Sequence, residues 1–497
     1  MNSMNQLTIR TSLVVVVALT CFVLLPSAPA VNPPPDGGYP GGNTAEGTDA
    51  LFSLTSGAGN TAIGNSALGN NTTGEGNTAT GSSSLLLNRT GDFNTATGFN
   101  ALRNNTASGN TANGAFALFF NTTGTPNTAN GAQALLNNTT GAQNTATGSA
   151  SLLNNTTGDF NTANGHRALS NNTTADFNTA IGWSALSDNI TGTYNTASGA
   201  GALFANTSDE NTATGAGALL SNSTGRANTA DGAFALVNNT TGSGNTAIGD
   251  QALFTSTTCC CNTATGRQSL FHNTTGEANT AIGQQALFSN TTGSSNTAVG
   301  NLAGGNVTTA NGIICIGENV AGANVNDTCF IGNIRGTTTQ NNDAIPVLID
   351  SAGQLGTASS SRRYKTDIKP MDKASESILA LKPVSFRYKI HKDMTPQFGL
   401  IAEQVAEINP NLVIYDADGK PYTVRYDAVN AMLLNEFLKE HRRVQELEAT
   451  VTQQKKDSEA AAVRQQKQID ALTAGLQKVS AQLGASRSAP QVADSNY

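Results

Sequence analysis

The chain has 497 residues, a formal net charge of −7, one Trp and 51 Gly, and only 12% of its residues are charged. Lys, Arg and Glu gather after about residue 360. The scarcity of basic residues before that point argues against a nucleic-acid partner there. Gly-, Asn- and Thr-rich tracts are often disordered, but Ala and Leu keep a strict register in this one, which favours a folded repeat.

The N-terminus has the pattern of a secretory signal peptide over residues 1–30. Arg10 precedes an apolar run at 13–25, and Ala28-Pro29-Ala30 forms a small-residue cleavage site. We therefore expect a secreted or cell-surface protein without a membrane span after cleavage. An uncleaved anchor is the alternative, although the run is short for a spanning helix. The Pro-rich segment 31–42 is expected to be a linker.

The tripeptide Asn-Thr-Ala occurs sixteen times between Asn43 and Asn296, nearly always seventeen residues after its last appearance. Only the steps to Asn110 and Asn211 are one residue shorter. A fixed period of this kind indicates one structural unit stacked on copies of itself. The fold class is therefore mostly β, with a parallel β-solenoid over 43–310 and degenerate repeats or a cap over 311–356.

The consensus of the repeat is N-T-A-x-G-x-x-A-L-x-x-N-T-T-G-x-x. Its alternating small apolar positions favour two short strands per rung. The Asn-Thr-Thr-Gly segment is typical of a turn, and stacked Asn side chains can form amide ladders. Because one rung buries little apolar surface, we expect chains to associate as a homo-oligomer that covers a Leu/Phe column. The column comprises Leu68, Leu102, Phe119, Leu135, Leu236, Phe254 and Leu287.

Residues 43–333 resemble the head repeats of trimeric autotransporter adhesins, which are parallel β-rolls built from three chains. The resemblance implies a fibre or adhesin. A surface-binding protein, with a glycan, matrix or ice ligand on the stacked Asn and Thr columns and an uncleaved C-terminal domain, is an alternative. Neither a cofactor nor a metal site is expected.

Five cysteines follow the predicted signal peptide, and three of them are adjacent at Cys259, Cys260 and Cys261. An odd number in an exported chain fits a free thiol or cross-links between chains. The adjacent cysteines lie at the turn position of one repeat, where we interpret them as a loop insertion without a special role.

After residue 356 the composition changes to that of an α+β domain. Helices are expected over 373–381 and 403–408, and a strand over 384–390. A hairpin is expected from 412–415 and 422–425 around Asp418-Gly419, and Asp427 is expected to cap a long helix. Apolar residues at 3,4 spacing predict a three-stranded coiled coil over 444–484. Residues 485–497 are expected to be a disordered tail.

Three motifs stand in order in this region: Ser360-Ser361-Arg362-Arg363-Tyr364-Lys365, Phe398-Gly399-Leu400-Ile401-Ala402-Glu403-Gln404-Val405 and Val424-Arg425-Tyr426. With them, residues 357–443 resemble the self-cleaving intramolecular chaperone domain of endosialidase and other phage tailspikes. The resemblance implies cleavage between Ser359 and Ser360, with Ser360 as nucleophile and Lys365 as general base. A lysine acts as a base only when neutral, and Arg362 and Arg363 are candidates for lowering its pKa. Family members often carry His where this chain has Gln397, which puts the efficiency of cleavage in question.

The sequence thus predicts an exported trimeric fibre whose C-terminal chaperone drives assembly and is released by one autoproteolytic event in cis. No activity on external substrates is expected. A phage tail fibre is a further alternative, against which the signal peptide argues.

Overall fold

The computed structural model describes residues 39–341, 343–389 and 395–486. The predicted signal peptide, most of the linker and nearly all of the predicted tail lie outside these residues. The chain divides into two compact units, one ending at Thr338 and the other beginning at Thr339, and each is described by itself.

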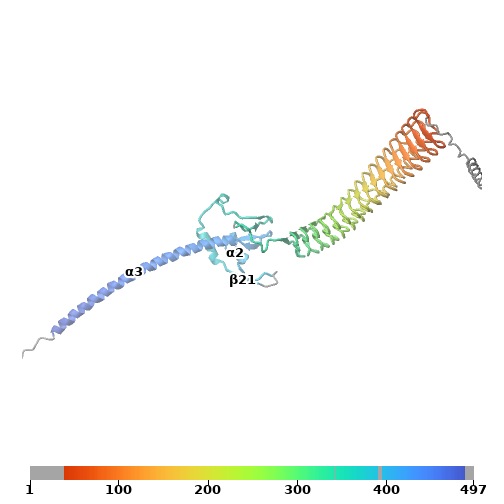
Figure 1. Ribbon diagram of the computed structural model, residues 1–497. Coiled ribbons are helices and arrows are strands. Elements are labelled where there is room, and N and C mark those ends of the chain that lie inside the picture. Colours follow the sequence, from red (N-terminus) through yellow and green to blue (C-terminus); the bar gives the residue numbers. More distant parts are fainter. Residues whose placement is uncertain (1–38, 342, 390–394, 487–497) are drawn as a thin grey trace, which may run out of the picture. The chain divides into compact units, whose positions relative to one another are not determined.

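The first unit is a parallel β-solenoid, as predicted (Figure 1). Each turn contributes one three-residue strand, and from β1 to β16 the Thr and Ala of each strand pair with those of the next, as in Thr162↔Thr179. The strands are β1 (Thr44–Glu46), β2 (Thr61–Ile63), β3 (Thr78–Thr80), β4 (Thr95–Thr97), β5 (Thr111–Asn113), β6 (Thr128–Asn130), β7 (Thr145–Thr147), β8 (Thr162–Asn164), β9 (Thr179–Ile181), β10 (Thr196–Ser198), β11 (Thr212–Thr214), β12 (Thr229–Asp231), β13 (Thr246–Ile248), β14 (Thr263–Thr265), β15 (Thr280–Ile282), β16 (Thr297–Val299), β17 (Ile314–Ile316) and β18 (Cys329–Ile331).

The prediction of two strands per rung was wrong, because the Ala-Leu half of each repeat forms tight turns. In one rung Ser66 and Leu68 have φ values of 57° and 49°, in the left-handed region that a strand does not use. This geometry recurs in the other rungs and turns the leucine side chain into the coil. Burial of that side chain, rather than strand alternation, explains the apolar spacing.

The predicted Leu/Phe column between chains was also wrong. Leu68, Leu102, Leu135, Leu236 and Leu287 are buried inside a single coil, with at most 1% of each exposed. Phe119 and Phe254 follow a buried leucine by one position and are half-buried at the surface. The solenoid therefore encloses its own core, and its leucines give no reason to expect a trimer.

The predicted Asn ladders are present, and they line the interior beside the leucines. The Asn161 Nδ2 group donates to the Ala175 carbonyl at 2.8 Å, and its Oδ1 accepts from the Asn178 N–H at 3.0 Å. A second ladder joins Asn172 Nδ2 to Asn155 Oδ1 at 2.7 Å. These bonds satisfy backbone groups in a dry interior, where an unpaired group is costly.

Asn161→Ala is expected to destabilise the rungs around β8 and β9 by roughly 1–3 kcal/mol, because it leaves the buried Asn178 N–H unpaired. The Ala175 carbonyl keeps its bond from Asn172, so a single group is orphaned. Amide hydrogen exchange of the full chain measures this local opening. Thr162→Ala, at an exposed site on the same strand, is the control and should change exchange little.

Glycine is required where consecutive rungs touch. Gly165 has a φ of 145°, and a Cβ built on it would lie 2.3 Å from the Gly182 carbonyl oxygen. No side chain fits at that distance. This explains why the repeat keeps a glycine directly after the third residue of each strand.

The second unit begins with short elements that expose most of their side chains. They are β19 (Leu348–Ile349), β20 (Leu355–Gly356), the 3₁₀ turns η1 (Arg362–Tyr364) and η2 (Asp372–Ala380), β21 (Val384–Phe386) and β22 (Gln397–Gly399). The helix expected at 373–381 is thus a 3₁₀ segment, and the strand expected at 384–390 is shorter.

The rest of the second unit follows the sequence more closely. It contains α2 (Ala402–Ile408), η3 (Pro410–Leu412), β23 (Val413–Tyr415), β24 (Pro421–Val424) and α3 (Tyr426–Ser486). The hairpin at Asp418-Gly419 is confirmed, with β23 and β24 antiparallel. Asp427 lies in the first turn of α3 rather than capping it; an acidic residue there still complements the helix dipole.

A small core and one polar cluster hold these elements together. The buried core comprises Val405, Leu412, Val413, Val424 and Met432. Beside it the buried Ser375 of η2 donates to Glu436 of α3, and Lys439 donates to the same carboxylate at 2.7 Å. The hydrogen bonds from Lys439 and Ser375 lower the pKa of Glu436, so the cluster fixes η2 to α3 while the carboxylate is ionised.

Candidate functional site

Ser360 and Lys365 lie together at the start of the chaperone-like segment. Between them, η1 folds the chain back, with the Tyr364 N–H donating to the Ser361 carbonyl at 3.0 Å and the Lys365 N–H to the Arg362 carbonyl at 3.1 Å. This turn brings Lys365 Nζ to 3.1 Å from Ser360 Oγ. A lysine amine at that distance can remove a serine proton if the amine is neutral.

The surroundings of this pair are open in the single chain. Residues 357–370 are all exposed, and the Arg363 guanidinium lies over the Tyr364 ring, 4.8 Å from its centroid. A lysine is activated by desolvation or by nearby cations. In a single chain, the Lys365 amine, which would have to lose its proton to act as a base, is therefore exposed to solvent.

The second and third motifs contact each other. The Leu400 N–H donates to the Tyr426 hydroxyl at 3.0 Å, which joins the end of β22 to the start of α3. A Cβ at Gly399 would lie 2.8 Å from that hydroxyl and 3.3 Å from the Phe386 ring. Glycine therefore lets Tyr426 approach the backbone, a role that the Phe-Gly-Leu spacing alone did not reveal.

Gln397, at the position of the expected histidine, lies on β22 opposite Phe386 of β21. Within the described residues, no hydrogen bond joins Gln397 to Ser360 or Lys365. The structure therefore brings the first motif's serine and lysine together without a contribution from Gln397.

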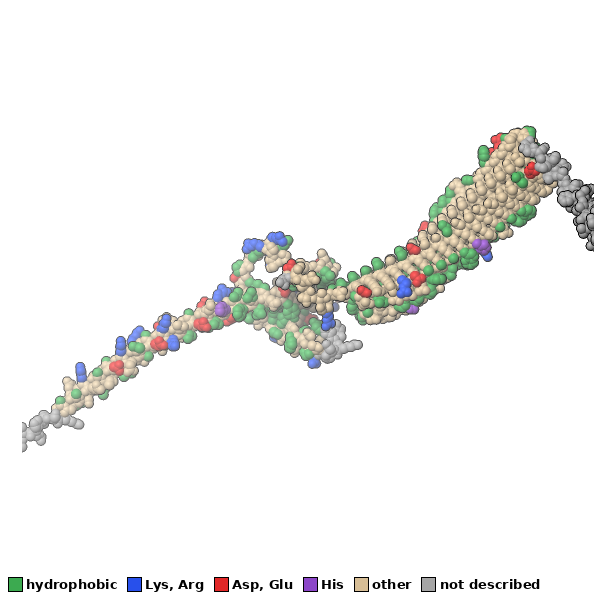
Figure 2. Space-filling model, viewed as in Figure 1, with side chains coloured by type: hydrophobic (Ala, Val, Ile, Leu, Met, Phe, Trp, Pro, Cys, Tyr) green, Lys and Arg blue, Asp and Glu red, His purple; other side chains and the backbone are tan. Residues whose placement is uncertain are grey.

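The second unit leaves large apolar side chains uncovered. Phe398 is 83% exposed, and Tyr422 and Leu379 are more than 70% exposed. An open groove of about 350 Å³ runs beside α2, with Leu381, Leu400, Ile401 and Ile408 among its lining residues. Figure 2 shows the charged side chains spaced along α3, with few on the visible face of the solenoid.

The three adjacent cysteines are not a loop insertion, because their rung keeps the seventeen-residue step from Asn245 to Asn262. Cys259 is buried and takes the place of the repeat's glycine, while Ser256 takes the place of the ladder asparagine. Their side chains are hydrogen-bonded at 2.8 Å, and burial raises the pKa of the Cys259 thiol. The neighbouring thiol of Cys261 raises the pKa of Cys260 to about 11. The thiols of Cys259 and Cys260 are therefore poor nucleophiles at neutral pH.

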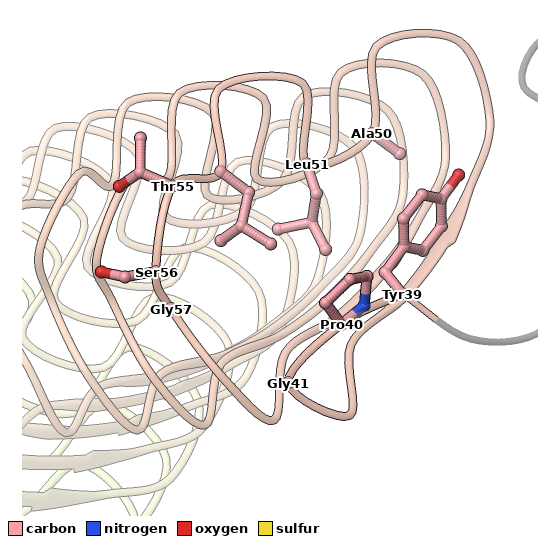
Figure 3. Close-up of a pocket in the computed structure, with 9 residues that line it drawn as sticks. Tyr39, Pro40, Gly41, Ala50, Leu51, Thr55, Ser56 and Gly57 are labelled. Carbon is pink, nitrogen blue, oxygen red and sulfur yellow. The ribbon is translucent and has the colours of Figure 1, made fainter.

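The N-terminal end of the solenoid is open, with a cavity of about 340 Å³ (Figure 3). Leu51 points into the coil there, and Tyr39 and Pro40 lie across its mouth. Its lining residues are apolar or small and include Tyr39, Leu51 and Leu54, with no charged side chain among them. Within the described residues, this cavity does not have the converging polar groups of a ligand site.

In residues 39–341, 343–389 and 395–486, no group of His, Cys, Asp or Glu is arranged to hold a metal ion. Within the same part of the chain, no helix combines the length and apolarity that crossing a membrane requires.

Comparison with known proteins identifies one segment. Residues 360–414 match the family model described as the chaperone of endosialidase, and the matched range begins at Ser360. A search of the curated proteins found no match, and neither did a search of the solved structures. The chain thus carries, after a parallel β-solenoid, a segment near its C-terminus that matches the model of the chaperone-of-endosialidase family.

Proposed function

We propose that this protein is an exported, tail-fibre-like structural protein that assembles as a parallel homotrimer, with the C-terminal unit driving assembly. The observation that carries the proposal is that the second unit does not complete its own core. Besides Phe398, Tyr422 and Leu379, the side chains left more than 60% exposed include Ile345, Val347, Ile349, Leu355, Tyr364 and Phe437. Exposed apolar surface on this scale is typical of interaction sites.

The long helix α3 favours copies of the same chain as the partner. Val444, Leu447 and Val451 lie along it at the 3,4 spacing of a coiled-coil seam, and each is about half exposed or more. A groove lined by these residues follows the helix. Parallel copies would align these seams and bring the exposed faces of their second units together. The coiled coil therefore supplies the alignment, and the chaperone segment supplies the shared core.

Cleavage between Ser359 and Ser360 is proposed to follow assembly. The Ser360 Oγ attacks the Ser359 carbonyl carbon as Lys365 takes its proton. The C–O bond forms, the peptide C–N bond breaks with protonation of the nitrogen, and water then hydrolyses the ester. Association would desolvate the lysine that is open in the single chain, because the exposed residues around it are those expected to contact other copies.

Cleavage after assembly, rather than before it, has a physical advantage. A stack of parallel rungs depends on long-range contacts and on aligning chains, which makes assembly slow. A terminal unit that aligns the chains first removes that step. Its release after assembly would then leave a fibre that cannot easily reverse the process.

A surface-binding role for the same fibre is the second candidate. Its motivating observation is the column of outward threonines, one per strand from Thr44 to Thr297, on the sheet face of the solenoid. A glycan or matrix ligand would contact this face. A phage tail fibre is the remaining alternative for the same domain order.

The processing state of separated species tests the proposal. Newly made protein is fractionated by size, and each fraction is analysed by intact mass spectrometry. The fragment beginning at Ser360 is expected only in material that has passed through the assembled fraction. A cleaved product that forms in monomer fractions, or an assembled species that never cleaves, would contradict the proposed order.

A further inference from the structure

The outward face of the solenoid sheet changes character in its last rungs. Each strand turns its first and third residues outward and its middle residue into the coil. From β1 to β16 the first outward residue is threonine. In β17 and β18 it becomes Ile314 and Cys329, which are directly paired.

The third outward residues change in the same direction. Upstream, an isoleucine such as Ile181 stands between polar neighbours, Asn164 and Ser198. From β15 onward the column is continuously apolar. The third residues of β15, β16, β17 and β18 are Ile282, Val299, Ile316 and Ile331, and these side chains are 43%, 38%, 41% and 44% exposed. We define the end face as these four residues together with Ile314 and Cys329.

We propose that the end face is where the solenoids of neighbouring copies of this chain pack against one another. The inference rests on the proposed self-association, and it adds the surface through which the rods meet. The occupant is a second copy because the end face ends at β18, shortly before the unit proposed to bring copies together. The segment between Ile331 and Leu348 can span at most roughly 3.3–3.6 Å per residue, so associated second units hold the end faces at high local concentration.

The chemistry of the end face fits such a contact. It contains no charged side chain, whereas the upstream face carries Glu46 and Asp231 among its outward residues. Glu318 comes two residues after the end of β17, and Asp327 comes two residues before the start of β18. These two carboxylates would form a charged rim around the end face. An apolar centre with a polar rim is the ordinary anatomy of a protein interface. In parallel copies the same rungs lie at the same height, so isoleucines meet isoleucines.

Cys329 provides the test because its thiol lies on this face and is exposed, while Cys259 and Cys315 are buried. The full chain with Cys21→Ser, Cys260→Ser and Cys261→Ser is treated with a short bismaleimide, a reagent that reacts with one thiol at each of its two ends. We expect a covalent dimer through Cys329, at a yield that does not fall on moderate dilution of the assembled protein. The matched control moves the thiol up the same column, with Cys329→Ser and Thr212→Cys, and should give little dimer.

A second variant tests the surface rather than the thiol. Ile316→Lys places like charges against each other in parallel copies, so the Cys329 cross-linking rate should fall by at least about tenfold. The mass in solution should be unchanged, because α3 and the chaperone segment are intact. Lysine at this exposed position leaves the coil interior undisturbed.

The outcomes separate this inference from the proposal beneath it. If the chains associate by sedimentation but Cys329 does not cross-link, or if Thr212→Cys cross-links equally well, the end face is not the contact and the self-association proposal stands. If the chains sediment singly, the self-association proposal fails and the inference fails with it.

Discussion

Ser360→Ala is expected to leave the chain intact, whereas the wild-type chain is expected to yield a fragment that begins at Ser360. The reason is geometric and chemical. Ser360 Oγ is the hydroxyl that Lys365 Nζ approaches to 3.1 Å, and alanine has no oxygen with which to attack the preceding carbonyl. Lys365→Met should slow the same reaction by roughly 10²–10⁴-fold, the usual contribution of a general base. Intact mass spectrometry of the purified protein reads both results.

The neighbouring serines make a matched control for this prediction. Ser359 Oγ accepts a hydrogen bond from the Ser361 N–H at 3.3 Å, and neither hydroxyl is paired with the lysine. Ser361→Ala should therefore cleave at nearly the wild-type rate. Cleavage that survives Ser360→Ala, or that disappears equally in Ser361→Ala, would remove Ser360 from the role of nucleophile.

The double substitution Leu447→Lys and Val451→Lys is expected to abolish self-association. Each chain of a trimer would lose the burial of a leucine, worth about 1.5–3 kcal/mol. Across the assembly the association constant should then fall by at least about 10³-fold, because 1.4 kcal/mol corresponds to a factor of ten. Sedimentation at several concentrations measures the change.

Ala449→Lys is the control for charge on the same helix. Ala449 lies midway between Leu447 and Val451 in sequence, on the side of α3 away from their seam. A lysine there adds one of the two charges of the double variant without entering the seam. It should leave the association constant within about tenfold of the wild type. An equal effect of both changes would mean that α3 does not join the chains through Leu447 and Val451.

The sequence was sufficient for the architecture of the solenoid because its period is a property of the chain itself. Seventeen-residue spacing required stacked rungs, and Asn161 and its equivalents formed the predicted ladders. The internal geometry of a rung was not predictable in the same way. The alternation at Ala67-Leu68 fits a strand as well as a turn, and only the left-handed backbone of Leu68 decides between them.

The column of Leu68 and its equivalents was assigned to the wrong surface for a related reason. Hydrophobic spacing shows which residues avoid water, but it does not show whether the same chain or another one covers them. Phe119 and Phe254 were placed in that column, although they lie one position beyond the buried leucine. The solenoid leucines are covered by their own chain, so the exposed apolar side chains of the second unit are what support self-association.

The candidate site was predictable where it rests on local sequence. The five-residue spacing of Ser360 and Lys365 is closed by a short turn, so the pair meets without help from distant segments. The contacts of Tyr426 with Leu400, and of Ser375 with Glu436, join residues far apart in the chain. Without a known structure to supply the topology, a single sequence contains little signal for such pairs.

The mass of the full-length chain in solution tests the central claim most directly, namely that the second unit completes its core only by joining copies of itself. Sedimentation equilibrium of the Ser360→Ala protein, which keeps the second unit attached, should give the mass of a trimer of the 50.9 kDa chain, less any signal peptide. The mass of a single chain, with slow amide exchange across residues 343–389 and 395–424, would show that the unit folds alone and would contradict the account.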